Sequence, residues 1–461
     1  MAHFKDIEES VAYVRAVCEY AKEKYGKPLS AFVLTFGCQQ NEADSERLRG
    51  MLDEMGYGKA SSAEAADVIL LNTCAIREHA ELKALSIIGS FKHLKEKNPA
   101  LLIGVCGCMS AEAHRVDELK RRYPYVSFTL EPAALYTLPK VLATVMKKKK
   151  RQFPLGAPDV VAEGVPVSRE HKHRAWVSIM YGCNNFCSYC IVPYVRGRER
   201  SRESTEIMSE VRTLVLGGAK DVTLLGQNVN SYRSDMDFPE LLQKLDAIEG
   251  DFVLRFMTSH PKDASDKLIE VLKTAKHIEP HFHLPLQSGS DRILLAMNRH
   301  YNRERYLSVV EKLRAALPNI VLTSDIIVGF PGETEEDFAQ TLDILKAVGF
   351  DSVYSFIYSP RKGTPAAKME NAVPSSLQSE RFRRLLDTQN AISYEKNLAY
   401  VGREVRVLVD GASKNDESVK SGRTDGGKLV HFWADDSAVG SFVTVHIDRA
   451  EPYALYGTVK E

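Results

Sequence analysis

The sequence predicts an α/β protein with three parts: an N-terminal parallel-sheet α/β domain, a central partial (β/α)6 barrel and a small C-terminal antiparallel β-barrel. Strand-like and helical runs alternate from residue 28 to about 145, and again from 169 to 399, a pattern typical of parallel sheets with crossover helices. After Gly402 the pattern changes to short alternating strands separated by turns rich in Gly, Asp and Ser. The length of 461 residues agrees with this division, since domains average roughly 150 residues.

The N-terminal part begins with residues 1–27, which we predict to be an amphipathic helix because apolar residues recur at helical spacing from Val11 to Tyr20. Within 28–145, strands are predicted at residues 31–36, 67–71 and 101–105, each followed by a helix; the first of these helices should run from near Asn41 to near Gly56. Residues 146–168 are predicted to be a linker. Its basic run from Lys147 to Arg151 is interpreted as a solvated segment, with an RNA contact as the alternative.

The central part contains six predicted strands, and each of the first five is followed by a helical pattern. They begin near Trp176, Val222, Phe252, Phe282, Ile320 and Ser352. Such a partial barrel is open on one side and carries its chemistry on the loops at the carboxyl ends of the strands. The C-terminal part, residues 402–461, has predicted strands at 405–409, 429–433 and 442–447, and small barrels of this type often bind oligonucleotides.

Composition narrows the possible partners and the compartment. Apolar residues make up 44% of the chain, enough for buried cores, and Lys plus Arg equals Asp plus Glu at 61 each. A nucleic acid would therefore have to be held by local basic patches, because the formal net charge is zero. The first residues lack the apolar stretch of a signal peptide and no run approaches the ~20 apolar residues of a spanning helix, so we expect a soluble cytoplasmic protein without a membrane partner.

The segment Cys183-Asn-Asn-Phe-Cys187-Ser-Tyr-Cys190 carries the most chemical information in the chain. Three thiolates at this spacing can hold three irons of a [4Fe–4S] cluster, whereas ordinary clusters of this type take four Cys ligands. The open iron suits the amino and carboxylate groups of S-adenosylmethionine, whose reductive cleavage gives a 5′-deoxyadenosyl radical. A structural zinc loop is the alternative, but it needs a fourth protein ligand, and no Cys follows Cys190.

A second set of cysteines, Cys38, Cys74 and Cys108, has spacings of 36 and 34 residues, close to one βα unit. Each should therefore follow the carboxyl end of a strand, and parallel neighbours would bring these ends to one edge of the sheet. We interpret them as a second three-ligand cluster site, with buried core cysteines as the alternative. Cys106 and Cys18 are interpreted as packed thiols.

With both cysteine sets in this order and a small terminal barrel, the chain resembles the radical-SAM methylthiotransferase family, and within it the MiaB-type tRNA-modifying branch, over residues 28–460. The matching stretches are residues 182–202, 224–232, 283–290, 325–334 and 358–364. The resemblance implies a radical SAM core at 169–399 and a TRAM domain, which is OB-like, at 402–461. Departures from the family pattern lie beside the second cysteine set, where Gln40 replaces the common Met and Ser110 to Glu112 replaces the usual Ala-Gln.

The resemblance implies a reaction: insertion of a methylthio group at C2 of N(6)-isopentenyladenosine, position 37 of tRNA. Cys183, Cys187 and Cys190 would hold the cluster that binds S-adenosylmethionine, and Cys38, Cys74 and Cys108 the cluster that supplies sulfur. Radical chemistry suits this substrate because the C2–H bond is beyond the reach of a side-chain base. We further expect a monomer that receives electrons from an external donor such as a flavodoxin or ferredoxin.

Further contacts are expected at strand ends and in the terminal barrel. For S-adenosylmethionine the candidates are Gly226, Gln227, Asn228, Ser259, Gln287, Ser288 and Gly329, each of which could instead serve only its turn. The alternating arginines from Arg196 to Arg202 suit phosphate contacts or internal ion pairs. In the terminal barrel, we expect Arg423, Lys428 and Phe432 to contact RNA, through the two positive charges and stacking on the aromatic ring. The alternative is that Phe432 belongs to the core of the barrel.

Two other functions remain open at this point. One is a sister methylthiotransferase that acts on threonylcarbamoyladenosine in tRNA or on a ribosomal-protein aspartate. The other is a non-catalytic RNA-binding iron–sulfur protein, which is disfavoured because both cysteine sets leave an iron open, whereas a structural site closes its coordination.

Overall fold

A computed structural model describes the whole chain except residues 1, 5–7, 76–77, 157–159, 414–415 and 461. The chain forms two compact units. The first comprises residues 1–170, 180–184 and 190–202, and the second comprises 171–179, 185–189 and 203–461. The segment that carries Cys183, Cys187 and Cys190 is thus shared, with Cys187 in the second unit and the other two cysteines in the first.

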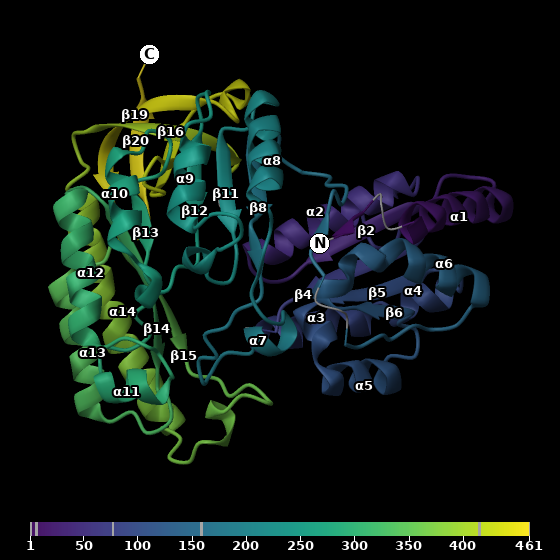
Figure 1. Cartoon of the computed structure of the whole chain (residues 1–461), viewed down its shortest axis with the longest axis horizontal. Coiled ribbons are helices and arrows are strands. Elements are labelled where there is room, and N and C mark those ends of the chain that lie inside the picture. Colours follow the sequence, from purple (N-terminus) through teal and green to yellow (C-terminus); the bar gives the residue numbers. More distant parts are fainter. Residues whose placement is uncertain (1, 5–7, 76–77, 157–159, 414–415, 461) are drawn as a thin grey trace. The chain divides into compact units, whose positions relative to one another are not determined.

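The first unit is built on a five-stranded parallel sheet of order β3-β2-β4-β5-β6 (Figure 1). Its strands are β2 (Ser30–Thr35), β3 (Gly58–Lys59), β4 (Val68–Thr73), β5 (Leu102–Gly107) and β6 (Phe128–Leu130). This order is that of a doubly wound sheet, in which the strand order reverses between β2 and β4. The three strands predicted from the sequence are confirmed within two residues at each end.

Helices cover both faces of this sheet, and alternate strand residues supply two separate cores. The helices are α1 (Glu8–Tyr25), α2 (Gln39–Glu54), α3 (Glu78–Ser90), α4 (Lys92–Lys97), α5 (Ala113–Arg122) and α6 (Leu138–Lys148). Val68 and Leu70 face α1, α2 and α6, whereas Ile69 and Leu71 face α3, α4 and α5. A continuous apolar run in β4 is what burial on both faces requires.

Short elements complete the first unit. They are β1 (Ala2–His3), β7 (Ala162–Glu163), β9 (Met180–Tyr181), β10 (Arg200–Ser201), α7 (Val192–Val195), and the 3-10 turns η1 (Cys108–Ala111) and η2 (Pro132–Thr137). The pairing of β1 with β7 joins the N-terminus to the segment predicted as a linker. In that segment, the Arg151 guanidinium donates to the carbonyl of Val126, 2.8 Å away, and lies over the Phe153 ring. The last residue of the basic run is therefore packed rather than solvated.

The second unit contains all six strands predicted for the central part. They are β8 (Arg174–Ser178), β11 (Asp221–Leu225), β12 (Val253–Phe256), β13 (His281–His283), β14 (Val321–Val328) and β15 (Ser352–Ile357). They form two parallel three-stranded sheets, of order β12-β11-β8 and β13-β14-β15. Backbone hydrogen bonds between Leu254 and the segment before β13 join the two sheets, so the partial barrel is continuous but weakly paired at this point.

Helices alternate with these strands along the chain. They are α8 (Ser204–Leu216), α9 (Phe238–Asp246), α10 (Asp266–Thr274), α11 (Asp291–Ala296), α12 (Arg303–Ala316), α13 (Glu335–Val348) and α14 (Ser375–Leu398), with 3-10 turns η3 (Val229–Ser231), η4 (Pro261–Asp263) and η5 (Ala366–Lys368). Local signals set several starts: Ser290, Asn302 and Thr334 each accept a backbone N–H at the N-cap of α11, α12 and α13. Among the described helices, none is long and apolar enough to cross a membrane.

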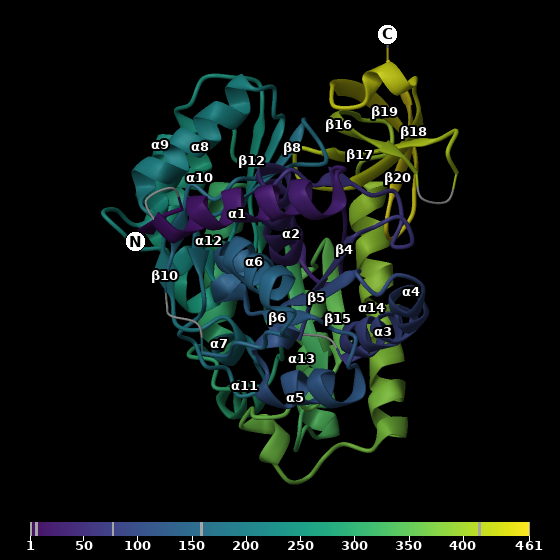
Figure 2. The same cartoon turned by 90° about the vertical axis from the view of Figure 1, so that its right-hand side faces the viewer.

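The C-terminal residues of the second unit form a closed five-stranded barrel of order β16-β17-β18-β20-β19 (Figure 2). The strands are β16 (Glu404–Ala412), β17 (Lys420–Thr424), β18 (Leu429–Trp433), β19 (Phe442–Ala450) and β20 (Leu455–Val459), with the 3-10 turn η6 (Asp436–Ala438). The small barrel is confirmed, but two of its strands, β17 and β20, were missed. All pairs are antiparallel except β18 with β20, which is parallel.

A buried arginine fastens this barrel to the rest of the second unit. Arg255 of β12 bonds Asp221 and Glu279, and its guanidinium also donates to the carbonyls of Thr424 and Asp425, 3.3 and 3.2 Å away. The turn between β17 and β18 is thereby held against the strands of the partial barrel.

Candidate functional site

Cys38, Cys74 and Cys108 follow the carboxyl ends of three adjacent strands, as their spacing predicted. Cys38 lies between β2 and α2, Cys74 follows β4 directly, and Cys108 begins the turn after β5. Cys74 and Cys108 are buried, Cys38 is exposed, and none of the three is in a disulfide. Cys38 and Cys74 flank the point where the strand order reverses, which is where doubly wound sheets bind their ligands.

A buried amide pair ties the loops of Cys38 and Cys74 together. The Asn41 side chain accepts from the Cys38 backbone N–H and donates to the carbonyl of Thr73, at 3.3 and 3.2 Å. The Asn72 side chain donates to the carbonyl of Asn41, 2.8 Å away. Both amides are fully buried and hydrogen-bonded to one another. A satisfied buried network of this kind holds its members in one arrangement.

Glycine is required at the turn that presents Cys108. Gly107 has a φ of 91°, and a Cβ there would lie 2.4 Å from the carbonyl oxygen of Thr73. Any other residue would therefore displace the chain beside both Cys74 and Cys108. Cys106, two residues earlier, is fully buried in the core of the sheet, as expected. Cys18 donates to the carbonyl of Met55, 3.1 Å away.

A buried arginine, Arg196, lies against Cys108. It is 4% exposed, its Nε lies 3.2 Å from Cys108 Sγ, and its Nη2 donates to the Asp44 carboxylate at 2.8 Å. Burial raises the pKa of the Cys108 thiol to about 12, while the nearby Arg196 opposes this rise. Binding a metal would remove that proton, since the thiolate is the ligand.

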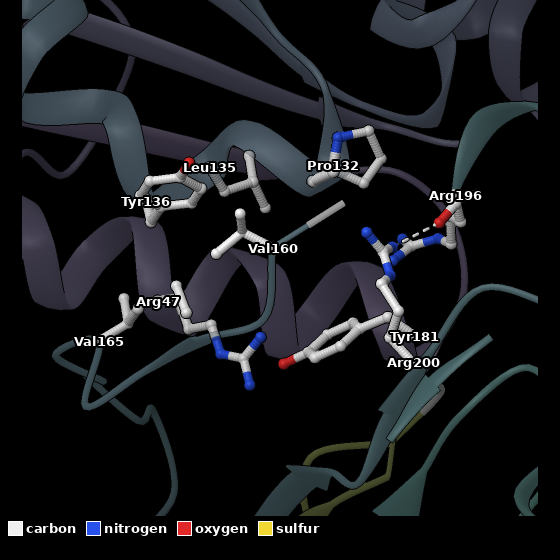
Figure 3. Close-up of a pocket in the computed structure, with 11 residues that line it drawn as sticks. Arg47, Pro132, Leu135, Tyr136, Val160, Val165, Tyr181, Arg196 and Arg200 are labelled. Carbon is white, nitrogen blue, oxygen red and sulfur yellow. Dashed lines mark hydrogen bonds between the residues drawn. The ribbon is translucent and has the colours of Figure 1, made fainter. Parts of the chain in front are cut away.

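The structure also shows where the other arginines of this run lie. Arg202 is buried and bonds the Glu163 carboxylate at 2.8 Å, so Arg196 and Arg202 make internal ion pairs, one of the two alternatives from the sequence. Arg200 donates to the backbone carbonyl of Arg196 (Figure 3). Arg47, Arg200 and Tyr181 line one side of a recess of about 520 Å³, solvent space included, opposite apolar residues such as Leu135. Arg196 thus contributes to this recess and contacts Cys108.

Residues near Cys187 hold its loop within the second unit. The Asn298 side chain donates to the carbonyl of Phe186, 2.9 Å away, and Phe186 has a φ of 46° that is rarely adopted by a non-glycine residue. Arg299 is 7% exposed, and its Nη1 lies 3.2 Å from Cys187 Sγ. In the first unit, the backbone N–H of Cys183 donates to the carbonyl of Gly197.

The donor chemistry of both cysteine sets fits [4Fe–4S] clusters. Each set has three cysteines that form no disulfide. Each set also has a buried guanidinium against one sulfur, the kind of hydrogen bond that cluster sulfurs accept. Within the described part of the chain, no three His, Cys, Asp or Glu side chains are arranged around a single metal ion. The three cysteines of a cluster each bind a different iron, so they need no such arrangement.

The candidates for S-adenosylmethionine binding all follow carboxyl ends of strands in the second unit. Gly226, Gln227 and Asn228 follow β11, Ser259 follows β12, Gln287 and Ser288 follow β13, and Gly329 follows β14. The Thr258 hydroxyl donates to the carbonyl of Gly226 at 2.6 Å, which joins the first two loops. Ser288 accepts the backbone N–H of Ser290, the residue that caps α11, so Ser288 also has a role in its own turn.

Several buried polar atoms in these loops have no hydrogen-bond partner among the described residues. They include Asn228 Oδ1 and Ser259 Oγ, both of candidate residues. Three further residues were not predicted from the sequence, and their unpaired atoms are Asn185 Oδ1, His260 Nε2 and both side-chain polar atoms of Asn230. Leaving such a group unpaired costs about 1–3 kcal/mol. A bound water or a polar ligand can supply the missing partners, and the amino, carboxylate and nucleoside groups of S-adenosylmethionine are suited to this.

His260 has a defined protonation state. Its Nδ1 accepts the backbone N–H of Lys262, so the proton of the neutral ring is assigned to Nε2. Burial, together with the nearby positive charge of Arg299, lowers the pKa of His260 to about 2. A hydrogen-bond donor is therefore available at Nε2 at every physiological pH.

In the terminal barrel, two of the three residues expected to contact RNA are buried. Phe432 is 3% exposed and belongs to the barrel core. The Lys428 ammonium is buried against the Asp351 carboxylate at 2.8 Å. Phe432 thus occupies an inward position of its strand, since inward and outward positions alternate along a barrel strand. The Lys428 cation is paired within the protein. Arg423 is half-exposed.

Trp433 is 69% exposed, and Tyr456 lies beside His431 and under the Arg449 guanidinium on the outer surface.

Comparisons with known proteins agree with this architecture. Family models match the Radical SAM superfamily at residues 177–345, the uncharacterized protein family UPF0004 at 30–131 and the TRAM domain at 398–460. The chain is 48% identical over 446 residues to a tRNA-2-methylthio-N(6)-dimethylallyladenosine synthase of Acetivibrio thermocellus, covering 95% of this chain and 93% of the relative. It is 49% identical over 431 residues to the enzyme of that name from Clostridium botulinum, covering 92% and 96%.

Among solved structures, the chain is similar to a radical S-adenosylmethionine methyltransferase, TsrM, from Kitasatospora setae, whose structure has cobalamin and a [4Fe-4S] cluster bound. The TM-score is 0.55 at 13% identity, and the match covers 74% of this chain and 77% of that one. At this identity the similarity concerns the fold alone.

Proposed function

Because the chain belongs to the family of tRNA-2-methylthio-N(6)-dimethylallyladenosine synthases, we propose that it inserts a methylthio group at C2 of N(6)-isopentenyladenosine at position 37 of tRNA. The observation that carries the proposal is the pairing of two cysteine sets in one chain. One is the loop of Cys183, Cys187 and Cys190, and the other lies at the carboxyl ends of three adjacent strands. A single set would suit a radical enzyme that transfers no sulfur.

The chemistry at each set follows from the groups that it would hold. When bound, the cluster of Cys183, Cys187 and Cys190 supplies the electron that cleaves S-adenosylmethionine, and the cluster of Cys38, Cys74 and Cys108 supplies sulfur. The chain's own residues bind and orient: Asn228, Ser259 and His260 offer unpaired polar atoms to S-adenosylmethionine, and Asn41 fixes the loops of Cys38 and Cys74. We further propose that the protein is a monomer and that it receives electrons from an external donor.

For RNA, we place the contact on the outer face of the terminal barrel. Trp433 and Tyr453 are 69% and 68% exposed, unusual values for large aromatic side chains. Tyr456, with Arg449 over its ring at 3.8 Å, adds a cation to the same barrel surface. Nucleobases stack on such aromatic groups, and a nearby guanidinium can contact phosphate.

The proposed function is tested with anaerobically reconstituted protein and tRNA that carries isopentenyladenosine. About eight irons are expected per chain, roughly four for each set. The triple Ala variant at Cys38, Cys74 and Cys108 should lose half the iron and make no methylthiolated nucleoside, yet still release 5′-deoxyadenosine. The triple Ala variant at Cys183, Cys187 and Cys190 should form neither 5′-deoxyadenosine nor the methylthiolated nucleoside.

Cys18→Ser is the matched control, because Cys18 is a thiol outside both sets and serine keeps its hydrogen bond to Met55. It should retain both products. Normal methylthiolation by the first triple variant would show that those cysteines do not hold the sulfur site. Nucleosides from tRNA of cells that lack the protein should correspondingly lack the methylthio group.

A further inference from the structure

In each cysteine set, a buried arginine lies against one of the sulfurs. In the first unit, Arg196 Nε lies 3.2 Å from Cys108 Sγ, and in the second unit Arg299 Nη1 lies 3.2 Å from Cys187 Sγ. A guanidinium stays charged at all working pH values, so each is a fixed positive charge at hydrogen-bond distance from a proposed cluster ligand.

The two arginines differ in how their charge is compensated. Arg196 bonds the Asp44 carboxylate at 2.8 Å, and Asp44 is itself 2% exposed. Arg299 has neutral partners instead: the Tyr301 hydroxyl, the carbonyl of Pro285 and the Tyr301 ring. Among the described residues, no carboxylate forms an ion pair with Arg299.

A buried guanidinium without a carboxylate needs another anion, because an uncompensated buried charge costs several kcal/mol. The sulfur of Cys187 is the group that can provide it. A [4Fe–4S] cluster with three thiolates carries net negative charge, which increases by one on reduction. A fixed cation beside it therefore favours the reduced state, and net charge and hydrogen bonds to sulfur are known determinants of cluster potentials.

We propose that Arg299 is the counter-charge of the cluster that binds S-adenosylmethionine and raises its reduction potential through Cys187, whereas Asp44 cancels the corresponding effect of Arg196 on the other cluster. The inference rests on the proposed function only in assigning a cluster to each cysteine set. It makes Arg299 a positioning and electrostatic residue that acts through Cys187 and does not itself react.

The test is a redox titration of the full-length, reconstituted protein, followed by electron paramagnetic resonance without tRNA. The signal that changes when S-adenosylmethionine is added identifies the cluster of Cys183, Cys187 and Cys190. Arg299→Gln should lower the reduced-to-oxidised ratio of this cluster at a fixed potential about tenfold, equal to a shift of 59 mV for a one-electron couple. Arg299→Lys retains the positive charge, so its reduction potential should stay near that of the unmodified protein.

Asp44→Asn is the matched variant for the other cluster and should shift its reduction potential in the opposite direction. The change removes the carboxylate that compensates Arg196 and keeps the arginine itself. It should raise the potential of the other cluster and leave the S-adenosylmethionine-responsive signal unchanged. A merely structural role for either residue would cause loss of iron and no opposite shifts. If Arg299→Gln fails to load its iron, Arg299→Lys decides: an iron complement and a potential like those of the unmodified protein would support the role of the charge, and loss of iron in Arg299→Lys as well would overturn it.

Unchanged potentials in Arg299→Gln and Asp44→Asn, with both clusters loaded, would overturn the inference and leave the proposed function intact. Failure of the unmodified protein to load two clusters would instead overturn the proposed function.

Discussion

The Lys428 ammonium lies 2.8 Å from the Asp351 carboxylate and 2.8 Å from the Asn397 amide oxygen, and it is buried over the Tyr400 ring. Lys428 belongs to the terminal barrel, whereas Asp351 precedes β15 of the partial barrel. One buried ion pair therefore links the two barrels of the second unit, and it buries a lysine that its sequence context had suggested for an RNA contact.

We expect Lys428→Ala to destabilise the second unit by about 3–5 kcal/mol, because it leaves the Asp351 carboxylate buried without its cation. Arg423→Ala is the control, since the Arg423 side chain is 48% exposed and its ion pair with Asp410 spans 3.7 Å. The measurement is the midpoint of urea unfolding followed by tryptophan fluorescence. Equal midpoints for the two variants would contradict the role assigned to Lys428.

We expect Trp433→Ala and Tyr453→Ala each to weaken tRNA binding by about 1–3 kcal/mol, the usual value of one stacked base. Both side chains are largely exposed, so thermal stability should be nearly unchanged. Titration of labelled tRNA carrying isopentenyladenosine measures the affinity, and Arg449→Ala should in addition reduce its dependence on salt. If all three variants bind as the unmodified protein does, the RNA surface lies elsewhere.

We expect Gly107→Ala to disturb the sulfur-supplying site, because its Cβ would lie 2.4 Å from the Thr73 carbonyl and its φ of 91° is unfavourable for alanine. The protein should lose up to half its iron while the S-adenosylmethionine-responsive signal persists. The control is Gly89→Ala in α3, where the new methyl group meets no atom within 4 Å. A full iron complement and normal methylthiolation in Gly107→Ala would show that the turn tolerates a side chain.

We expect His260 to make stability depend on pH. Its pKa is about 2 when folded, while the unfolded ring has an ordinary pKa of about 6.5. Above about pH 6.5 the His260 ring is neutral in both the folded and the unfolded state, so it does not change the free energy of unfolding. As the pH falls below 6.5 the unfolded state gains the proton first, and unfolding becomes easier by up to about 1.4 kcal/mol per pH unit.

His260→Asn should flatten this dependence between pH 6.5 and 5, because asparagine can still accept the Lys262 N–H but does not titrate. The exposed His300, changed to Asn, serves as the control and should keep the slope. The comparison uses urea unfolding of each protein at several pH values. The same slope in all three proteins would mean that His260 is not held neutral.

The sequence alone determined the order of the parts, the six strands of the partial barrel and the register of Cys38, Cys74 and Cys108. These features depend on local periodicity and on the length of a βα unit, both of which can be read along the chain. The strands β17 and β20 were not predicted, because Gly and polar residues in Lys420–Thr424 and Leu455–Val459 interrupt the alternation of apolar side chains.

Only the tertiary structure decided which charged and polar side chains are paired. Arg196 and Arg202 resemble exposed phosphate ligands in the sequence, but Asp44 and Glu163, which bond them, are 152 and 39 residues away. Lys428 is paired by Asp351, and the unpaired atoms of Asn185, Asn230 and His260 are evident only once their surroundings are known. Burial and charge compensation are properties of distant neighbours, and no local pattern of residues encodes them.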